Sequence, residues 1–456
     1  MKGTDTMSAR LTRRMKALAT GAGALALGVL IALGATAPAN AAPEVDPAAT
    51  GSINVHKLAQ PDSATGLPHN GTQVDTTGLT PLEGVTFSVQ RVTDIDLTDP
   101  ADWQILEGLD AATVAAQHTL GAPQSQVTDE RGDAVFAGLP IGVYLVSETD
   151  PGQNGITIAG EPFLVSVPTP LEGDWIYDVH VYPKNTVTTA PVKTVDDADA
   201  FVIGDAVAWT ITAKVPAVVD GQRLTHFALT DSLDSRLDYV GASVSVEGVT
   251  LDAADYTITP GPAFAVSFTA SGLAKLENAA GATITVVIDT TVNAIGDGAI
   301  ENSATVFVND PDHSNGLESV PVTTSWGSLR VLKHGGDDTD LTLAGAEFDV
   351  HNAAGEVVAH IVTGEDGIAV IDLKAGDYTL VETAAPLGYV LDPTPIPVTV
   401  VEGATASTQV TVSNEQVPAF QLPLTGGDGT ALFIAAGVAI ALLGAGIGLT
   451  RRRTAA

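Results

Sequence analysis

The segment GSLRVLK at residues 327–333 has a close copy, GSINVHK, at residues 51–57. In both copies apolar and polar residues alternate and a lysine ends the run, a pattern that predicts a β-strand with one buried face. Two further pairs repeat in the same order: LEGVTFSV at 82–89 with LAGAEFDV at 343–350, and the segments 132–156 with 367–390. The chain is therefore predicted to contain one β-fold twice.

The rest of the chain also favours an all-β protein. Runs rich in Val, Thr, Ile, Phe and Tyr are separated by Gly, Asp, Asn and Pro turns, which is typical of β-sandwiches. The first copy carries an insertion of about forty residues between Val89 and Val127, longer than an ordinary connection, with a helical stretch at 102–120. Residues between the two copies have a different strand pattern, which predicts a second kind of sandwich.

The length of 456 residues suits several domains, each with its own core. We predict three tandem immunoglobulin-like sandwiches between a signal peptide and a C-terminal sorting segment. Short linkers are predicted at NTVTTAPV and VPVTTSWG. The predicted boundaries are 1–41, 42–188, 189–324, 325–418 and 419–456.

The two ends of the chain carry targeting signals. Residues 10–16 are basic, an apolar run follows, and APANA ends at Ala41, which predicts a secretory signal peptide. Residues 431–449 are uncharged and apolar and precede three arginines, which predicts a membrane span with a positive stop. The motif LPLTG comes just before this span.

Motif, span and basic tail together resemble the cell-wall sorting signal of Gram-positive surface proteins. The resemblance implies that a sortase cuts between Thr425 and Gly426 and passes the threonine carbonyl to an amine. The alternative is a lasting single-pass anchor in which LPLTG is a chance linker. The residues implied in sortase recognition are Leu422, Pro423, Leu424, Thr425 and Gly426.

Composition excludes several classes of function. The formal net charge is −34, so the surface repels nucleic acid. The chain has no cysteine, although an exported protein could form disulfides, so its durability must come from elsewhere. No metal-ligand spacing, nucleotide fingerprint or catalytic set occurs, so we expect no cofactor, no metal and no enzymatic function. The loop at 309–319 has oxygens suited to calcium, but a polar turn is favoured because the EF-hand spacing fails.

The lysines are few and unusually placed. Seven follow residue 41, and three of these fall in the apparent first strand of a predicted domain. Each domain also has an asparagine in its apparent last strand and a carboxylate in a central strand. The resulting triplets are Lys57/Glu148/Asn185, Lys193/Asp231/Asn302 and Lys333/Glu382/Asn414.

These triplets predict intramolecular cross-links. Burial lowers the pKa of a lysine and leaves a neutral, nucleophilic amine. A nearby Asp or Glu can polarise the asparagine carbonyl and carry the proton, assisting autocatalytic formation of a Lys–Asn isopeptide bond with loss of ammonia. By the chain-entropy estimate used for disulfides, closing loops of this length stabilises each domain by about 4 to 5 kcal/mol. The alternative is that these residues are ordinary surface lysines, turn asparagines and solvated carboxylates.

A further lysine, Lys184, stands next to Asn185 in WIYDVHVYPKNT. Strand alternation points neighbouring side chains to opposite faces, so Lys184 is predicted to face solvent if Asn185 faces the core. The segment resembles the pilin motif of sortase-assembled Gram-positive pilus shaft subunits, and YTLVETAAPLGY at 378–389 resembles their E box. The pilin-motif residues are Trp175, Val179, Val181, Tyr182, Pro183 and Lys184.

The resemblance implies a structural major subunit of a covalent surface pilus on a Gram-positive cell. It implies CnaB-like outer domains, a CnaA-like middle domain, and a class C sortase that joins Thr425 of one copy to Lys184 of the next. The expected partners are identical subunits, this sortase, a housekeeping sortase with peptidoglycan, accessory minor pilins, and an unidentified ligand on a host or bacterial surface. The alternative is a wall-anchored adhesin or a minor tip or base pilin.

Overall fold

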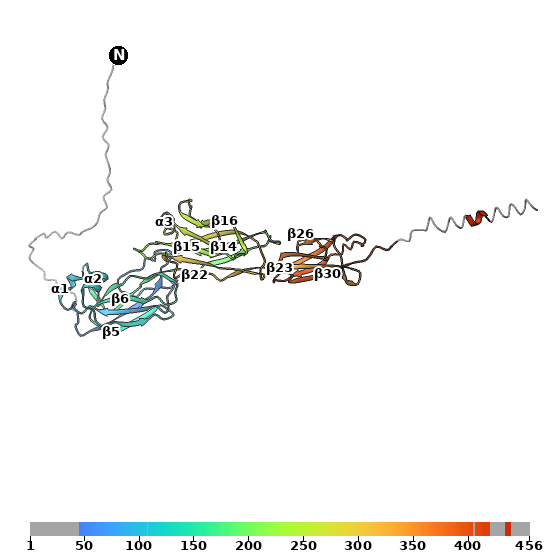
Figure 1. The fold of residues 1–456 in the computed structure, drawn as a ribbon. Coiled ribbons are helices and arrows are strands. Elements are labelled where there is room, and N and C mark those ends of the chain that lie inside the picture. The colour runs from blue at the N-terminus through green and yellow to red at the C-terminus, as the bar shows by residue number, and fades with distance from the viewer. Residues whose placement is uncertain (1–44, 107, 405, 420–433, 439–456) are drawn as a thin grey trace, which may run out of the picture. The chain divides into compact units, whose positions relative to one another are not determined.

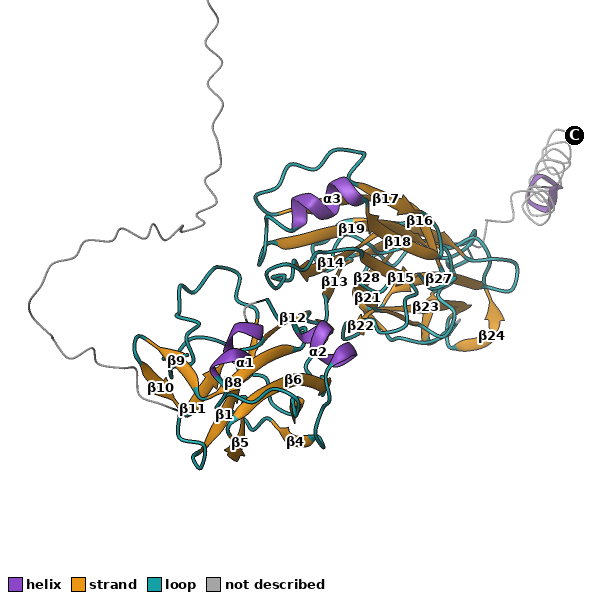
Figure 2. Ribbon diagram, turned by 90° about the vertical axis from the view of Figure 1, so that its left-hand side faces the viewer, coloured by secondary structure: helices purple, strands orange, loops and turns teal. Residues whose placement is uncertain are grey.

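The computed structural model describes residues 45–106, 108–404, 406–419 and 434–438. The predicted signal peptide (1–41), the LPLTG motif with Thr425, and most of the predicted span at 431–449 lie outside these residues. Within the described residues, no helix is long and apolar enough to cross a membrane. The prediction of an all-β chain is confirmed, because strands dominate and helices are few and short (Figures 1 and 2).

The N-terminal region, residues 45–187, forms sheets that enclose one principal core. One sheet has the strand order β11-β1-β5, a second has β2-β12-β7, and a third has β4-β3-β6-β8. Ile53, Phe87, Phe136 and Val146 are buried between them. The elements are β1 (Thr50–His56), β2 (Leu58–Ala59), β3 (Thr86–Arg91), α1 (Pro100–Ile105), α2 (Ala111–Gln117), β4 (Gln124–Val127), β5 (Asp133–Pro140), β6 (Gly142–Asp150), β7 (Ile156–Ile158), β8 (Phe163–Val167), β9 (Thr169–Leu171), β10 (Asp174–Ile176), β11 (Asp178–Val181) and β12 (Lys184–Val187).

The helical stretch predicted in the insertion is confirmed as α1 and α2. Both helices begin at an aspartate whose carboxylate accepts a hydrogen bond from a backbone N–H of the first turn, Asp99 for α1 and Asp110 for α2. Val92, Ile95 and Val114 of the insertion form a second, smaller core against β6. The insertion therefore packs on the sandwich as a layer of its own.

The middle region, residues 192–326, is a sandwich of a sheet ordered β13-β14-β19-β16 and a sheet ordered β17-β18-β15-β21-β22. Its largest buried side chains are Trp209, Phe227, Phe264 and Trp326. The elements are β13 (Val192–Asp196), β14 (Ala206–Lys214), β15 (Phe227–Ser232), β16 (Leu237–Val246), β17 (Tyr256–Thr259), β18 (Ala263–Phe268), α3 (Ala270–Leu276), β19 (Thr283–Val292), β20 (Ala299–Asn302), β21 (Ala304–Val308) and β22 (Leu317–Glu318).

The C-terminal region, residues 327–416, repeats the plan of the N-terminal region. Its first strand pairs in parallel with its last, and a second sheet has the order β26-β25-β28-β29. Glu382 lies opposite Phe348 in this second sheet, as Glu148 lies opposite Phe87 in the first copy. The elements are β23 (Val322–Gly335), β24 (Asp338–Thr342), β25 (Glu347–His351), β26 (Val357–Val362), β27 (Ile368–Lys374), β28 (Gly376–Ala384), β29 (Ile396–Val400) and β30 (Thr408–Asn414).

Two local predictions are wrong. The segment VPVTTSWG is not a linker, because most of it belongs to the long strand β23, whose first part pairs with β20 and whose later part pairs with β27 and β30. Trp326 within it is buried in the middle core. Helix α3 also departs from the prediction that the middle region consists of strands alone. Thr269 caps this helix, and Leu273 and Leu276 are buried on one face of it.

Candidate functional site

The structure brings the nine predicted residues together as three clusters, one in each region. In the two outer regions, lysine and asparagine come from adjacent parallel stretches: Lys184–Asn185 pairs with Leu58–Ala59, and β23 pairs with β30. The glutamate comes from the facing sheet, from β6 or β28. Each outer cluster therefore bridges the two layers of its sandwich.

The N-terminal cluster has the closest approach of amine and amide. Lys57 Nζ lies 2.5 Å from Asn185 Oδ1 and 2.9 Å from Glu148 Oε2. Asn185 Nδ2 donates to both glutamate oxygens, at 2.8 and 2.9 Å. Lys57 and Asn185 are fully buried and the Glu148 side chain is 4% exposed, so all three groups meet out of water.

A backbone group completes this cluster. The Gly160 N–H, in the loop between β7 and β8, donates to Asn185 Oδ1 at 2.6 Å. A Cβ at this position would lie 3.2 Å from Asn185 Oδ1, which is tighter than most contacts of a Cβ. The glycine thus lets a donor approach the carbonyl oxygen that would become negative during attack on its carbon.

The middle cluster is built differently. Lys193 Nζ makes a close contact with Asp231 Oδ2, and Asn302 Nδ2 lies 3.5 Å from the same oxygen. The expectation that Asn302 lies in the last strand is wrong, because β20 is followed by β21, β22 and the start of β23. The strand that carries Lys193 also does not pair with the strand that carries Asn302: β13 pairs with β14, and β20 pairs with β23. The three residues meet across the sandwich instead.

The C-terminal cluster spreads over both oxygens of one carboxylate. Lys333 Nζ lies 3.0 Å from Glu382 Oε1, and Asn414 Nδ2 donates to Glu382 Oε2 at 2.8 Å. Asn414 Nδ2 also donates to the Val390 carbonyl at 2.7 Å. Within the described residues, the buried Asn414 Oδ1 accepts no hydrogen bond, unlike Asn185 Oδ1.

Burial sets the protonation of these groups. Desolvation lowers the pKa of Lys57, Lys193 and Lys333, and the nearby carboxylate offsets part of that effect in each case. Desolvation likewise raises the pKa of Asp231, although Lys193 opposes it. In the middle cluster these two shifts favour a neutral Lys193 amine beside a protonated Asp231, which is the reactive form for attack on an amide.

An aromatic ring under each lysine was not predicted as part of the site. Each lysine Nζ lies 5.6 Å from the centroid of one ring: Phe87 for Lys57, Trp209 for Lys193 and Phe348 for Lys333. All three rings are buried and exclude water from the amine. The repeat itself held the signal for the outer two rings, since TFSV and EFDV align at Phe87 and Phe348.

Lys184 is placed differently from these lysines. It is the first residue of β12, it is partly exposed, and its ammonium has no ion-pair or hydrogen-bond partner among the described residues. Its neighbour Asn185 is fully buried, as strand alternation requires. The two adjacent side chains therefore differ in access to solvent: the Asn185 side chain is shielded from it, and the Lys184 side chain is partly exposed.

The other pilin-motif residues hold this strand end. Val179 and Val181 lie in β11, which runs parallel to β1, and Val179 is buried in the core. Tyr182 stacks on His56 and its hydroxyl accepts a hydrogen bond from the Val74 N–H. Trp175, in β10, packs against Trp103 of the insertion.

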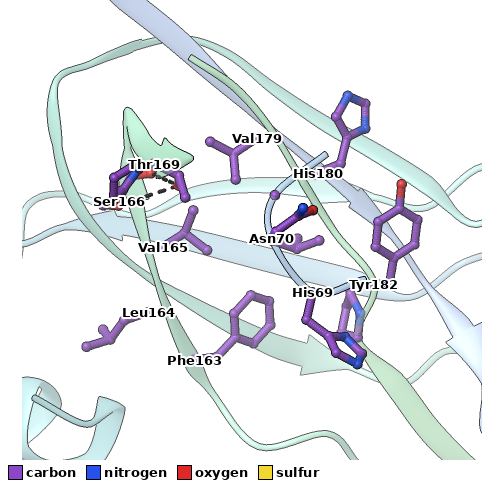
Figure 3. Close-up of a pocket in the computed structure, with 14 residues that line it drawn as sticks. His69, Asn70, Phe163, Leu164, Val165, Ser166, Thr169, Val179, His180 and Tyr182 are labelled. Carbon is purple, nitrogen blue, oxygen red and sulfur yellow. Dashed lines mark hydrogen bonds between the residues drawn. The ribbon is translucent and has the colours of Figure 1, made fainter. Parts of the chain in front are cut away.

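A pocket of about 500 Å³ opens beside the motif (Figure 3). Its lining comes from β8, β11 and the loop around Asn70, and extends along the motif as far as Pro183, one residue before Lys184. Phe163 and Val165 give it an apolar floor, and His180 and Tyr182 lie along one side of the view. Lys184 therefore directly follows, in the chain, a residue that lines this recess.

Comparison with protein-family models assigns most of the chain. Residues 48–186 match the Gram-positive pilin subunit D1 N-terminal domain, and residues 188–324 match the Sgo0707 N2 domain. Residues 327–416 match a prealbumin-like fold domain, and residues 414–455 match the LPXTG cell wall anchor motif. The two repeats of the sequence are thus matched by different models, and the anchor match includes residues 420–433 and 439–455, which lie outside the described residues.

Whole-chain relatives agree with these assignments. Fimbrial subunit type 2 of Actinomyces naeslundii is 30% identical over 90% of this chain and 91% of its own length. Fimbrial subunit type 1 of Actinomyces viscosus is 29% identical over 97% and 98%. The full-length major pilin SpaD of Corynebacterium diphtheriae is 28% identical, covers 82% of this chain and 99% of its own, and superposes with a TM-score of 0.69. The chain therefore belongs to the sortase-assembled major pilins of Gram-positive bacteria, and is a shaft subunit of a pilus anchored to the cell wall by its LPXTG signal.

Proposed function

We propose that each of the three clusters forms a Lys–Asn isopeptide bond as its domain folds. The neutral lysine Nζ attacks the asparagine Cγ, and a new N–C bond replaces the bond from Cγ to Nδ2. The carboxyl group donates a proton to Nδ2, which leaves as ammonia, and recovers one from the attacking amine. The roles fall to Glu148, Asp231 and Glu382. The observation that carries this proposal is the meeting of all nine residues in three buried clusters.

The reaction in the N-terminal region has one extra donor. As Cγ becomes tetrahedral, negative charge gathers on Asn185 Oδ1, where the Gly160 N–H already points. This favours cross-linking at Lys57 in spite of the long insertion. Each cluster reacts once and is consumed, so the chemistry is maturation and the chain is not an enzyme.

Lys184 is proposed as the acceptor of the intersubunit bond. A pilin-specific class C sortase would hold Thr425 of one copy as a thioester and release it to the Lys184 amine of the next. The partly exposed amine, free of ion pairs within the described chain, and the recess beside it support this role. Head-to-tail linkage of this kind does not close on itself, so it builds a filament. A housekeeping sortase would then attach the filament to peptidoglycan, with accessory minor pilins completing the fibre and its adhesive contacts.

The proposed domains are residues 42–188, 189–324 and 325–418, with the last boundary inside β23. Tension in such a filament enters a subunit at Lys184 and leaves at Thr425. Cross-links at Lys193–Asn302 and Lys333–Asn414 would lie on that path. Each would carry the tension directly, so that the residues between the two linked positions would not be stretched. The link at Lys57–Asn185 would lie beside the path, where it fixes the strand that presents Lys184.

A polymerisation assay tests the intersubunit role. Cells that carry the pilin sortase should assemble the wild-type chain into a ladder of covalent polymers, and the Lys184→Arg variant should remain monomeric. Lys214→Arg, at an exposed lysine of the middle region, is the matched control and should polymerise normally. A full ladder from Lys184→Arg would overturn the assignment and favour another acceptor. A wild-type chain that stays monomeric would favour an anchored adhesin or minor pilin.

A further inference from the structure

Two histidines of the middle region face each other outside the clusters described above. His226 immediately precedes β15, and His313 lies in the loop between β21 and β22. Their Nε2 atoms are 3.3 Å apart, with ring centroids 5.4 Å apart and the ring planes inclined by 50°. The same loop, residues 309–319, carries the oxygens that the sequence offered as calcium ligands.

The loop is held in place by its own contacts. Asn309 Oδ1 accepts hydrogen bonds from the Thr225 and His226 N–H groups, and Asn309 Nδ2 donates to the Arg223 carbonyl. The Asp310 carboxylate accepts from Ser314 Oγ and from the Asn315 N–H. These oxygens already accept hydrogen bonds from neighbouring groups, which argues against a calcium site built from them.

The ring of His313 is fixed as well. It stacks on Phe307 with centroids 4.2 Å apart and planes within 10°. His313 takes a positive φ of 53°, which a residue with a side chain rarely adopts and which holds the backbone in a costly conformation. The stack on Phe307 therefore holds the His313 imidazole in place opposite that of His226.

The two nitrogens are within hydrogen-bond distance of each other, and their separation also fits a shared metal ion. A Zn²⁺ ion holds imidazole nitrogens at about 2.0–2.1 Å in tetrahedral geometry, which places two of them about 3.3 Å apart. The 3.3 Å between His226 Nε2 and His313 Nε2 matches that spacing, whereas the 2.8 Å between His56 Nε2 and His180 Nδ1 in the N-terminal region is too short for it.

We propose that His226 and His313 bind a divalent transition-metal ion, Zn²⁺, through their Nε2 atoms. Within the described residues no group of three His, Cys, Asp or Glu side chains is arranged to hold a metal, so the chain supplies two ligands and water completes the shell. The net charge of −34 raises the local concentration of cations.

Calorimetric titration of the 42–426 chain, produced without a histidine tag and freed of metal, tests the site. Zn²⁺ should bind with one site per chain. His226→Ala and His313→Ala should each weaken binding at least about tenfold, since even groups that only orient a metal ligand contribute that much. His351→Ala removes a histidine of the C-terminal region that contacts only a backbone carbonyl, and should leave the titration unchanged.

The alternative outcomes are distinct. Equal Zn²⁺ binding by the double variant His226→Ala/His313→Ala would assign the metal to surface carboxylates and overturn the proposal, as would no saturable binding by the wild type. Circular dichroism establishes that the variants are folded. As a second readout, binding should weaken at about pH 5.5, where imidazoles take up protons and most surface carboxylates stay charged. Affinity that persists there would also contradict the site.

Discussion

The N-terminal region and the two regions after it carry the same kind of cluster, but in the proposed filament, linked from Lys184 to Thr425, they would differ in whether they bear tension. Between Lys184 and Thr425 the chain runs through the middle and C-terminal regions, and each of these has its lysine in its own first strand, Lys193 in β13 and Lys333 in β23. Residues 45–183 lie outside it. Cross-links in the later regions would thus carry force, whereas the link at Lys57 would only hold the acceptor strand in place.

The two groups also differ in architecture. Lysine and asparagine of the outer regions come from neighbouring parallel stretches, whereas Lys193 and Asn302 come from strands that do not pair with each other. The middle region uses the shorter Asp231, which contacts both partners through a single oxygen. The same three chemical groups can therefore be assembled on different strand orders, provided that the core buries them.

The largest effect is expected from Asp231→Ala in the middle region. It removes the carboxyl group proposed to assist the bond and leaves the buried Lys193 amine with the Ser303 carbonyl as its remaining hydrogen-bond partner among the described residues, which is costly. Loss of the cross-link alone lowers the free energy of unfolding by about 4 to 5 kcal/mol. Stretching single sortase-made polymers should now unfold a loop of roughly 110 residues per subunit and lengthen it by roughly 360–390 Å.

Asp220→Asn is the matched control for this variant, since Asp220 is an exposed aspartate of the same region. It should keep the wild-type mass and extension. If Asp231→Ala polymers stretch no further than wild type, the cross-link at Lys193 does not lie on the path of tension.

Lys333→Arg should have a similar but smaller effect in the C-terminal region. Arginine keeps a positive charge beside Glu382 but cannot attack the amide, so the bond fails without leaving the carboxylate unpaired. We expect a loss of about 4 to 5 kcal/mol in urea unfolding of this region. The extension per subunit should be roughly 270–290 Å, from a loop of roughly 80 residues. Unchanged urea unfolding beside a Lys214→Arg control would contradict this expectation.

Glu148→Gln tests most clearly whether the N-terminal region differs from the two later regions in bearing tension. The bond at Lys57 should be lost, and urea unfolding of the N-terminal region should become easier by about 4 to 5 kcal/mol. Polymers of this variant should nevertheless stretch like wild type, because residues before Lys184 bear no tension. The exposed Glu130→Gln serves as control. Extra extension in Glu148→Gln polymers would show that the N-terminal region is under tension after all.

The smallest effect concerns pH and is confined to the N-terminal region. Burial and the neighbouring His56 lower the pKa of His180, although Asp178 and Asp133 partly oppose this shift. The unfolded chain binds a proton near pH 6.5 more readily than the folded one, so stability should fall as the pH drops below about 6.5. Leu332 stands in the C-terminal copy where His56 stands in the first, so no such pair exists there.

The pH effect is measured as the urea midpoint of the N-terminal region across this range. His180→Gln should flatten the dependence, because the titrating ring is gone, and the C-terminal region should show no comparable slope. A variant whose midpoint falls with pH as steeply as that of wild type would assign the effect to other groups.

The self-repeat made the outer folds predictable, because alternation and turn residues recur at aligned positions in both copies. It also aligned Lys57 with Lys333, and Lys193 was found because it occupies the apparent first strand of the middle region in a chain with few lysines. The strand order of the middle region could not be read this way: β20 returns to pair with β23, a contact across loops that no local pattern specifies. Gly160 was missed because a backbone N–H leaves no mark in the sequence.

Intact-mass measurement of the folded 42–426 chain, followed by peptide mapping, shows whether the three buried clusters react. We expect a deficit of three ammonia molecules, with cross-linked peptides joining Lys57 to Asn185, Lys193 to Asn302 and Lys333 to Asn414. Lys184 should remain unmodified and available to the sortase. A folded chain with its full calculated mass, or with links at other residues, would rule out the three proposed isopeptide bonds.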